Sequence, residues 1–212
     1  MKYKTLNRLI SPLVKIIWPS KIFGMENLKI DTNAIFVCNH YTTMDTNVLY
    51  AKIFKDDLNV LVKAEAFEKK FAAKFLSKIG GIPVRRGEAD IIAMKEVFKR
   101  LKKGKSVLIY PEGTRNKTNI KEMLPLKTGA AWFALYEKLP IIPILYYKPA
   151  RMFRKNYLII GKPIYFNALY DKPTNDNKIV ATQILYDEMK KLRIEIDTIV
   201  ESRKVKIKHV KN

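Results

Sequence analysis

The sequence predicts an α/β domain, in which a central, mostly parallel sheet has helices on both faces and is preceded by short N-terminal amphipathic helices. From residue 30 onward, short apolar runs alternate with segments of helical periodicity. The chain has 212 residues, of which 48% are hydrophobic, enough for one sizeable core. Polar motifs follow several of the apolar runs directly, and sites in parallel sheets collect at the carboxyl ends of strands.

The predicted strands are short apolar runs. They span Ala34–Asn39, Leu58–Lys63, Ile82–Arg85, Val107–Tyr110, Ile141–Tyr146, Tyr157–Ile160 and Ile164–Phe166. The predicted helices span Asp45–Phe54, Glu68–Ile79, Glu88–Lys103, Gly129–Lys138 and Asn177–Val200. Glycines follow two of these helices, at Gly80-Gly81 and at Gly104, and glycine is favoured directly after a helix.

The second of these helices, Glu68–Ile79, allows two interpretations. It carries Phe71 and Phe75 on one side and lysines 70, 74 and 78 on another. The phenylalanines fit a helix that packs on the core and exposes its lysines to solvent. The same pattern fits contact with a membrane.

The N-terminal segment, residues 1–24, is predicted to form short amphipathic helices. One helical face carries Leu6, Leu9, Ile10, Leu13 and Ile17, and the opposite face carries Lys4, Arg8 and Lys15. Ser11-Pro12 is typical of the start of a second short helix, and Trp18 closes the segment. This composition favours a helix in a membrane interface, and the alternative is a helix packed on the core. Residues 25–203 form the predicted α/β domain, and residues 204–212 form a basic tail.

The net charge of +21 favours anionic partners. Nucleic acid, an anionic bilayer and phosphate-bearing ligands all fit such a field, although biased codon usage could also produce it. No segment has the eighteen or so apolar residues of a spanning helix, and the N-terminus lacks the pattern of a signal peptide. We therefore expect a peripheral or monotopic protein at the cytoplasmic face of the membrane. The single cysteine, Cys38, lies in an apolar run and is expected to be a buried, inert thiol rather than a nucleophile.

A histidine and an aspartate follow the first predicted strand of the α/β domain, in Asn39-His40-Tyr41-Thr42-Thr43-Met44-Asp45. Histidine can act as a base near neutral pH, and a carboxylate on its second ring nitrogen orients it. Five residues along a helix turn by about 140°, so the two side chains could not meet on one helix. A loop between a strand and a helix can bring them together. We therefore predict that His40 is a general base oriented by Asp45.

Two further loops are predicted to reach the same edge of the sheet. Arg85, Arg86 and Gly87 follow one strand, and Pro111–Asn116 follows another. Arginine suits phosphate recognition, and glycine lets backbone N–H groups approach an oxyanion. The sequence contains neither a cluster of metal ligands nor a serine elbow. These residues together indicate deprotonation of a hydroxyl group beside a bound phosphate.

Four sequence blocks resemble the signatures of the glycerolipid acyltransferases, nearest to the bacterial 1-acyl-sn-glycerol-3-phosphate acyltransferases. The blocks are Asn39-His40 with Asp45, Gly80–Arg86, Pro111–Arg115 and Pro140–Ile144. They occur in the order of the family, and the resemblance covers most of residues 30 to 165. It implies acyl transfer from acyl-CoA or acyl carrier protein to the sn-2 hydroxyl of lysophosphatidic acid, without an acyl-enzyme, a cofactor or a metal.

The resemblance also implies roles for further residues. Arg86 and Arg115 would hold the phosphate, with Gly113 and Thr114 as donors and Lys127 as a weaker contact. Glu112 would position Arg115 or the glycerol, and Pro140–Ile144 would lie near the acyl site. Two alternatives stay open, namely a different lysolipid acceptor within the family and a basic nucleic-acid-binding module. The second lacks any RNP-like or zinc-finger pattern.

Overall fold

The computed structural model describes residues 11–53, 58–85, 90–118, 122–170 and 173–209, with side chains up to residue 203. Within these ranges the chain forms a seven-stranded sheet in the order β1-β7-β6-β2-β5-β3-β4. The strands are β1 (Ser20–Phe23), β2 (Ile35–Cys38), β3 (Asn59–Lys63), β4 (Gly81–Val84), β5 (Val107–Ile109), β6 (Ile141–Tyr146) and β7 (Asn156–Ile160). All neighbours are parallel except β6 and β7, so the predicted mostly parallel sheet is confirmed.

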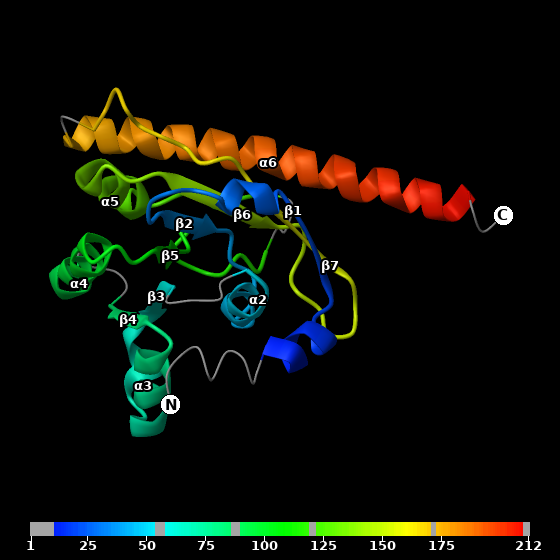
Figure 1. Ribbon diagram of the computed structural model, residues 1–212, viewed down its shortest axis with the longest axis horizontal. Coiled ribbons are helices and arrows are strands. Elements are labelled where there is room, and N and C mark those ends of the chain that lie inside the picture. The colour runs from blue at the N-terminus through cyan, green and yellow to red at the C-terminus, as the bar shows by residue number, and fades with distance from the viewer. Residues whose placement is uncertain (1–10, 54–57, 86–89, 119–121, 171–172, 210–212) are drawn as a thin grey trace.

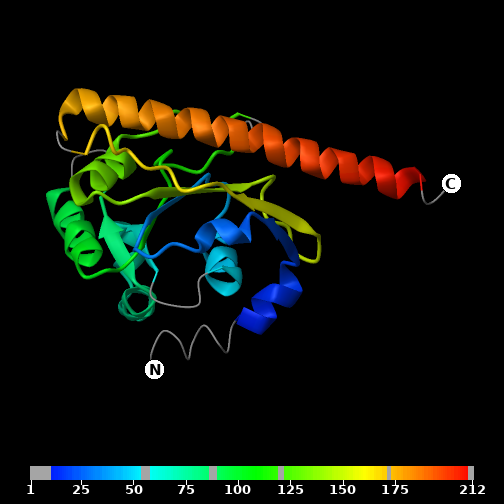
Figure 2. The ribbon, with the colours of Figure 1, turned by 45° about the horizontal axis from the view of Figure 1, so that its top comes forward.

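Helices lie on both faces of the sheet, as predicted (Figure 1). On one face, α2 (Asp45–Lys52) and helical residues 11–17 pack on β2, β5 and β6 through Val48, Leu49 and Val14. On the other face lie α4 (Ile91–Lys102), α5 (Gly129–Glu137) and α6 (Asn175–His209). Figure 2 shows α6 along the length of the molecule on this second face.

The remaining helices lie near the two edges of the sheet, with η2 and α3 at the β4 edge and η1 near the β1 edge. The short 3-10 helix η2 (Ala64–Phe67) and α3 (Lys70–Lys78) connect β3 to β4, and α3 contacts both η2 and β4. A further 3-10 helix, η1 (Met25–Leu28), follows β1. None of the helices in the described ranges is both long enough and apolar enough to cross a bilayer.

Three features of the fold differ from the predicted elements. Residues Ser20–Phe23, which we assigned to the N-terminal segment, form β1 beside β7. The predicted strand Ile164–Phe166 contributes one bridge, between Ile164 and Ile141. The preceding Pro163 has no N–H with which to extend that pairing. Helix α6 continues to His209, beyond the predicted end at Val200 and into the predicted tail.

The N-terminal helix packs on the core, which is one of the two alternatives that its sequence allowed, and its contact with a membrane stays a prediction. Residues 1–10 of the predicted amphipathic segment lie outside the described residues. Val14 and Trp18 are buried in the core beside α2. Leu13 and Ile16, on the other side of the same turn, are 57% and 69% exposed. The segment is therefore attached to the domain and still presents an apolar surface to its surroundings.

Candidate active site

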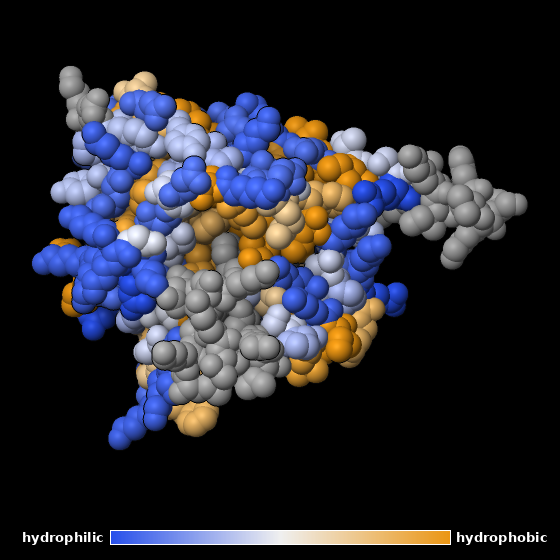
Figure 3. Space-filling view, in the orientation of Figure 1, coloured by the Kyte–Doolittle hydropathy of each residue, from blue (hydrophilic) through white to orange (hydrophobic). Residues whose placement is uncertain are grey.

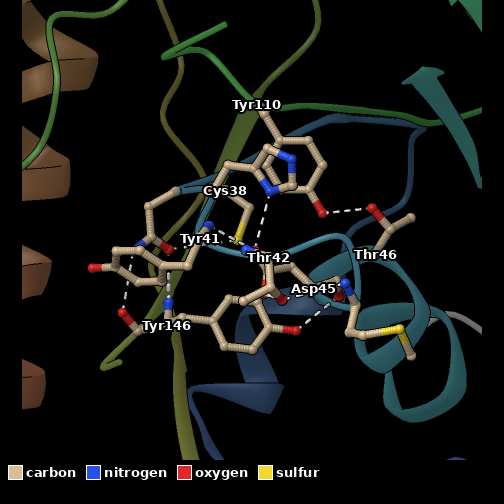
Figure 4. Close-up of polar contacts among 10 residues, drawn as sticks. Cys38, Tyr41, Thr42, Asp45, Thr46, Tyr110 and Tyr146 are labelled. Atoms are coloured by element: carbon tan, nitrogen blue, oxygen red, sulfur yellow. Dashed lines mark hydrogen bonds and ion pairs between the residues drawn. The ribbon is translucent and has the colours of Figure 1, made fainter. Parts of the chain in front are cut away.

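His40 and Asp45 form a hydrogen-bonded pair at the carboxyl end of β2 (Figure 4). The Nδ1 atom of His40 lies 3.0 Å from Oδ2 of Asp45, which is fully buried. The same oxygen accepts the backbone N–H groups of Tyr41 (2.7 Å) and Thr42 (2.8 Å), and Oδ1 accepts the Thr42 hydroxyl at 2.7 Å. With Nδ1 directed at the carboxylate, Nε2 is the ring nitrogen that can take a proton from a substrate.

The loop between β2 and α2 brings the pair together, as its sequence spacing predicted. Asp45 is the first residue of α2, and its N–H donates to the carbonyl of Thr42 at 3.3 Å. The carbonyl of Asp45 in turn accepts the hydroxyl of Tyr146 at the end of β6 (2.8 Å). The Asn39 side chain bonds both the N–H and the carbonyl of Tyr146. Both ends of the loop are therefore fixed to the neighbouring strand.

The loop Pro111–Asn116 is hydrogen-bonded to the backbone of His40. The N–H of Asn116 donates to the carbonyl of His40 at 2.7 Å. Burial raises the pKa of Glu112 to about 7, although hydrogen bonds from the N–H groups of Leu124 and His40 act to lower it. Among the residues that the structure describes, the Oε2 atom of Glu112 has no hydrogen-bond partner. The loop therefore supports the position of the histidine through main-chain contacts.

Tyr110 stacks on the imidazole of His40 and was not identified from the sequence. The two ring centroids are 4.0 Å apart, with an interplanar angle of 22°. The tyrosine hydroxyl shares a hydrogen bond of 2.8 Å with the hydroxyl of Thr46. Burial raises the pKa of Tyr110 well above 10, so the hydroxyl is neutral. Tyr110 lies between Pro111 and the end of β5, the strand that neighbours β2. This position was the one signal in the sequence that could have indicated the stack on His40.

A cavity of about 570 Å³ opens beside His40 at the carboxyl ends of β3, β4 and β5. Most of its lining from β3, β4, β5, α4 and α5 is apolar, through Leu61, Val62, Val84, Ala93, Met94, Val97, Ile109, Trp132 and Phe133. Most of these side chains belong to, or pack against, the core cluster between the sheet and helices α4 to α6. The cavity therefore extends from a histidine into an apolar slot, which suits an acyl chain.

Basic side chains line the cavity near His40. Arg115 and Lys127 are exposed lining residues, and Lys63 and Arg85 add two further positive charges. Gly113 has a φ of 69°, and a Cβ atom there would lie 2.7 Å from Cε of Lys127. Glycine therefore permits the left-handed backbone and allows the lysine stem to cross the loop. A positive rim of this kind can bind a phosphate group.

The predicted site residues fall into four groups. His40, Gly113, Arg115 and Lys127 line the cavity, whereas Asp45 and Glu112 are buried behind it. Thr114 is exposed and is not a lining residue. Arg86 lies outside the described residues. Among the described side chains, Glu112 forms no ion pair with Arg115, and its contacts are with the backbone instead.

Two other sequence expectations concern neighbouring residues. The block Pro140–Ile144 lies in and just before β6, beside β2, and none of its residues lines the cavity. Cys38 is completely buried, and this burial raises the pKa of its thiol well above 9. The thiol therefore stays protonated, as expected for an inert cysteine. The described residues contain no group of three or more side chains suited to hold a metal ion.

Comparison with known proteins identifies the family. Residues 20–147 match the family model described as Acyltransferase, which is more than half of the chain. The 1-acyl-sn-glycerol-3-phosphate acyltransferase of Bacillus subtilis is 29% identical over 202 residues, 93% of this chain and 100% of that protein. The enzyme of the same name from Borreliella burgdorferi is 29% identical over 177 residues, 80% of this chain and 70% of that protein.

The fold supports the same assignment. The crystal structure of the 1-acyl-sn-glycerophosphate acyltransferase PlsC from Thermotoga maritima superposes with a TM-score of 0.63. The alignment covers 90% of this chain and 78% of that protein, and its sequence identity of 19% makes the likeness one of fold. The chain therefore belongs to the acyltransferase family and is an enzyme.

Proposed function

We propose that this enzyme transfers an acyl chain from an acyl thioester to the sn-2 hydroxyl of 1-acyl-glycerol-3-phosphate, giving phosphatidic acid for phospholipid biosynthesis. One observation carries the proposal: a single cavity joins an oriented histidine, a positive rim and an apolar slot. The names of the relatives from Bacillus subtilis and Borreliella burgdorferi support the choice of acceptor.

In the proposed mechanism, Nε2 of His40 removes the proton from the acceptor hydroxyl. The oxygen attacks the thioester carbonyl, and the tetrahedral intermediate collapses with cleavage of the C–S bond. The imidazolium then gives its proton to the leaving thiolate, so that a free thiol and an ester are formed and His40 is neutral again. Asp45 stabilises the imidazolium and keeps the ring oriented.

The phosphate of the acceptor is proposed to bind at the rim formed by Arg115, Lys127 and the backbone of Gly113, with Arg86 as a further ligand. Arginine can form two parallel hydrogen bonds with a phosphate, whereas lysine contributes a point charge. The acyl chain would then occupy the slot between β3, β4, α4 and α5. The buried position of Glu112 favours a positioning role, because it contacts the backbone of His40.

We also propose that the enzyme works as a peripheral or monotopic protein on the cytoplasmic face of an anionic membrane. The net charge of +21 and the exposed Leu13 and Ile16 of the N-terminal helix support this location. Coenzyme A and acyl carrier protein are both anionic, so both are candidate carriers of the acyl donor.

The experiment that tests the function measures thioester consumption by the purified protein with three acceptors offered separately. These are lysophosphatidic acid, glycerol-3-phosphate and lysophosphatidylcholine. We expect turnover with lysophosphatidic acid and loss of that turnover by about a thousandfold or more in His40→Ala. Preference for either other acceptor would overturn the proposed substrate, and normal turnover of His40→Ala would overturn the proposed base.

A further inference from the structure

Helix α3 differs from its neighbours because none of its side chains is buried. Phe71 is 88% exposed and Phe75 is 40% exposed. Helices α2, α4 and α5, in contrast, each bury several apolar side chains in the core. Exposure of two neighbouring aromatic side chains to water is unfavourable, so we expect this face of α3 to bind a partner.

The polar residues of α3 identify the chemistry of that partner. Its sequence, KFAAKFLSK, contains no acidic residue, and Lys70, Lys74 and Lys78 follow one another at helical spacing. These lysines lie beside the phenylalanines on the helix surface, and all three are exposed. Aromatic side chains next to a row of lysines are typical of a helix that lies in the interface of an anionic bilayer.

Helix α3 lies close in the chain to residues that line the cavity. It begins three residues after η2, and Lys63 and Ala66, at the end of β3 and in η2, both line the cavity. In Figures 1 and 2, α3 and helical residues 11–17 lie on the same side of the molecule, whereas α6 lies on the other side. Figure 3 shows hydrophobic surface beside hydrophilic surface at both of these places. Residues 11–17 add the exposed Leu13 and Ile16 to the same side.

We propose that α3 is a second membrane-binding helix, which acts with residues 11–17 to seat this side of the protein on an anionic bilayer. Phe71 and Phe75 enter the interface, and the lysines contact anionic headgroups. Two weak anchors bind a membrane more firmly than one, because the second contact forms within the already bound protein. The membrane contact of α3 does not depend on the proposed function. A role of this contact in directing a lipid into the cavity does depend on it.

A fluorescent label on α3 tests the contact directly. Phe71→Cys provides the site for an environment-sensitive dye, because Cys38, the single native cysteine, is fully buried. The matched control is Ile194→Cys on α6, where the native side chain is 67% exposed. We expect a blue shift of the α3 label on mixing with vesicles of phosphatidylcholine and phosphatidylglycerol, and no shift of the α6 label. Equal behaviour of the two labels would overturn the proposal.

Vesicle co-sedimentation then measures the contribution of the aromatic residues. We expect Phe71→Ser with Phe75→Ser to weaken partitioning about tenfold or more. The control pair, Ile184→Ser with Ile194→Ser, removes two isoleucines of α6 that are 39% and 67% exposed and is expected to leave partitioning unchanged. An equal loss in both pairs would show nonspecific destabilisation and would contradict a role for α3.

The charge of the helix is tested by a second pair of variants. Replacing Lys70, Lys74 and Lys78 by glutamine is expected to weaken binding to anionic vesicles about tenfold and to reduce its salt dependence. The control replaces Lys99 and Lys102 of α4 and Lys103 directly after it, and changes the net charge by the same amount. Equal effects of the two triple variants would show that binding depends on the net charge of the protein and not on the lysines of α3.

Two further measurements separate this proposal from its competitors. Acyl transfer to a short-chain lysophosphatidic acid in solution, without vesicles, is expected to be unchanged in Phe71→Ser with Phe75→Ser. If the native protein shows no acyl transfer, the proposed function fails while the vesicle result still stands. If sedimentation velocity shows a dimer that Phe71→Ser dissociates, the partner is a second copy of the chain and the membrane proposal is wrong.

Discussion

The two sides of the loop Pro111–Asn116 differ in how far their geometry is fixed. On the buried side, Asn116 and Glu112 contact the backbone of His40, and Asp45 holds its ring. On the cavity side, Arg115 and Lys127 are exposed at the rim. The ring of His40, the proposed base, is therefore held in place without substrate, whereas the rim side chains are exposed and are proposed to bind the phosphate. Substitutions on the buried side should affect turnover or folding, and those on the rim should affect substrate binding.

The largest effect is expected for Asp45→Asn. Asparagine can keep an oxygen where Oδ2 accepts the three N–H groups and place its NH₂ group beside the Thr42 hydroxyl, so the substitution removes the negative charge that stabilises the imidazolium. We expect kcat to fall roughly a thousandfold. The control is Thr42→Val, which removes the hydroxyl bond to Oδ1 and the bond from the N–H of Met44 while leaving the charge of Asp45, and should cost less than about tenfold. Equal losses in the two variants, with circular dichroism showing both folded, would contradict an electrostatic role for Asp45.

The next effect concerns the stability of the buried side. The pKa of Glu112 is about 7 in the folded protein, against an ordinary value of 4.5. Because the folded state holds this proton more tightly, the folded protein loses stability as the pH rises from 4.5 to about 7. The loss approaches about 3 kcal/mol above that range.

Glu112→Gln has no charge to bury, so it should lack this decline. Urea denaturation at about pH 5 and pH 8 gives the free energies of unfolding, and the exposed Glu122→Gln is the control. If the free energy of unfolding decreases equally with pH in Glu112→Gln and in the native protein, then the ionisation of Glu112 does not destabilise the folded state.

A smaller effect is expected on the rim. Arg115→Ala should raise KM for the acceptor about 10- to 100-fold, because a charge-assisted hydrogen bond to a phosphate contributes about 1.5 to 3 kcal/mol. The KM for the thioester should change little. Arg154→Ala, at another exposed arginine, controls for net charge. A change confined to the KM of the thioester would move Arg115 to the donor side.

The smallest effect is expected at Tyr110, where the stacking and the hydrogen bond can be separated. Tyr110→Phe keeps the ring on His40 and loses only the bond to Thr46, so kcat should fall about two- to threefold. Tyr110→Leu also removes the stack and should reduce kcat about tenfold. We expect a displaced pH profile of kcat in the leucine variant alone. Identical profiles in both variants would show that the stack does not position the imidazole.

The sequence was sufficient to predict the contact between His40 and Asp45, the proposed catalytic pair, because the two residues are close in the chain. His40 and Asp45 lie on one loop between a strand and a helix, and a five-residue spacing allows contact there. Most strands and helices of the α/β domain were also predicted, since their apolar periodicity reflects burial on the sheet. The stack of Tyr110 on His40 could not be predicted, because it depends on β2 and β5 being neighbours.

Contacts between distant residues were decided by the tertiary structure alone. Arg193 of α6 donates to the carbonyl of Tyr147 at 2.8 Å, and Ser20–Phe23 pairs with β7. Neither contact can be recognised from a local sequence pattern, because the order of the strands decides which distant residues become neighbours. The environment of Glu112 was also decided by the tertiary structure. Its burial distinguishes a residue that supports the backbone of His40 from one that forms a salt bridge at the surface.

By itself, the sequence determined the α/β class, the loop of the proposed catalytic pair and the loop with Arg115 that follows β5, because each depends on residues close together in the chain. The tertiary structure decided which of those residues face the cavity and which support it. It also decided that the phenylalanines of α3 are exposed and not part of the core, which the sequence left open. The physical reason is that periodicity fixes the faces of a helix, whereas the packing of the whole chain fixes what each face meets.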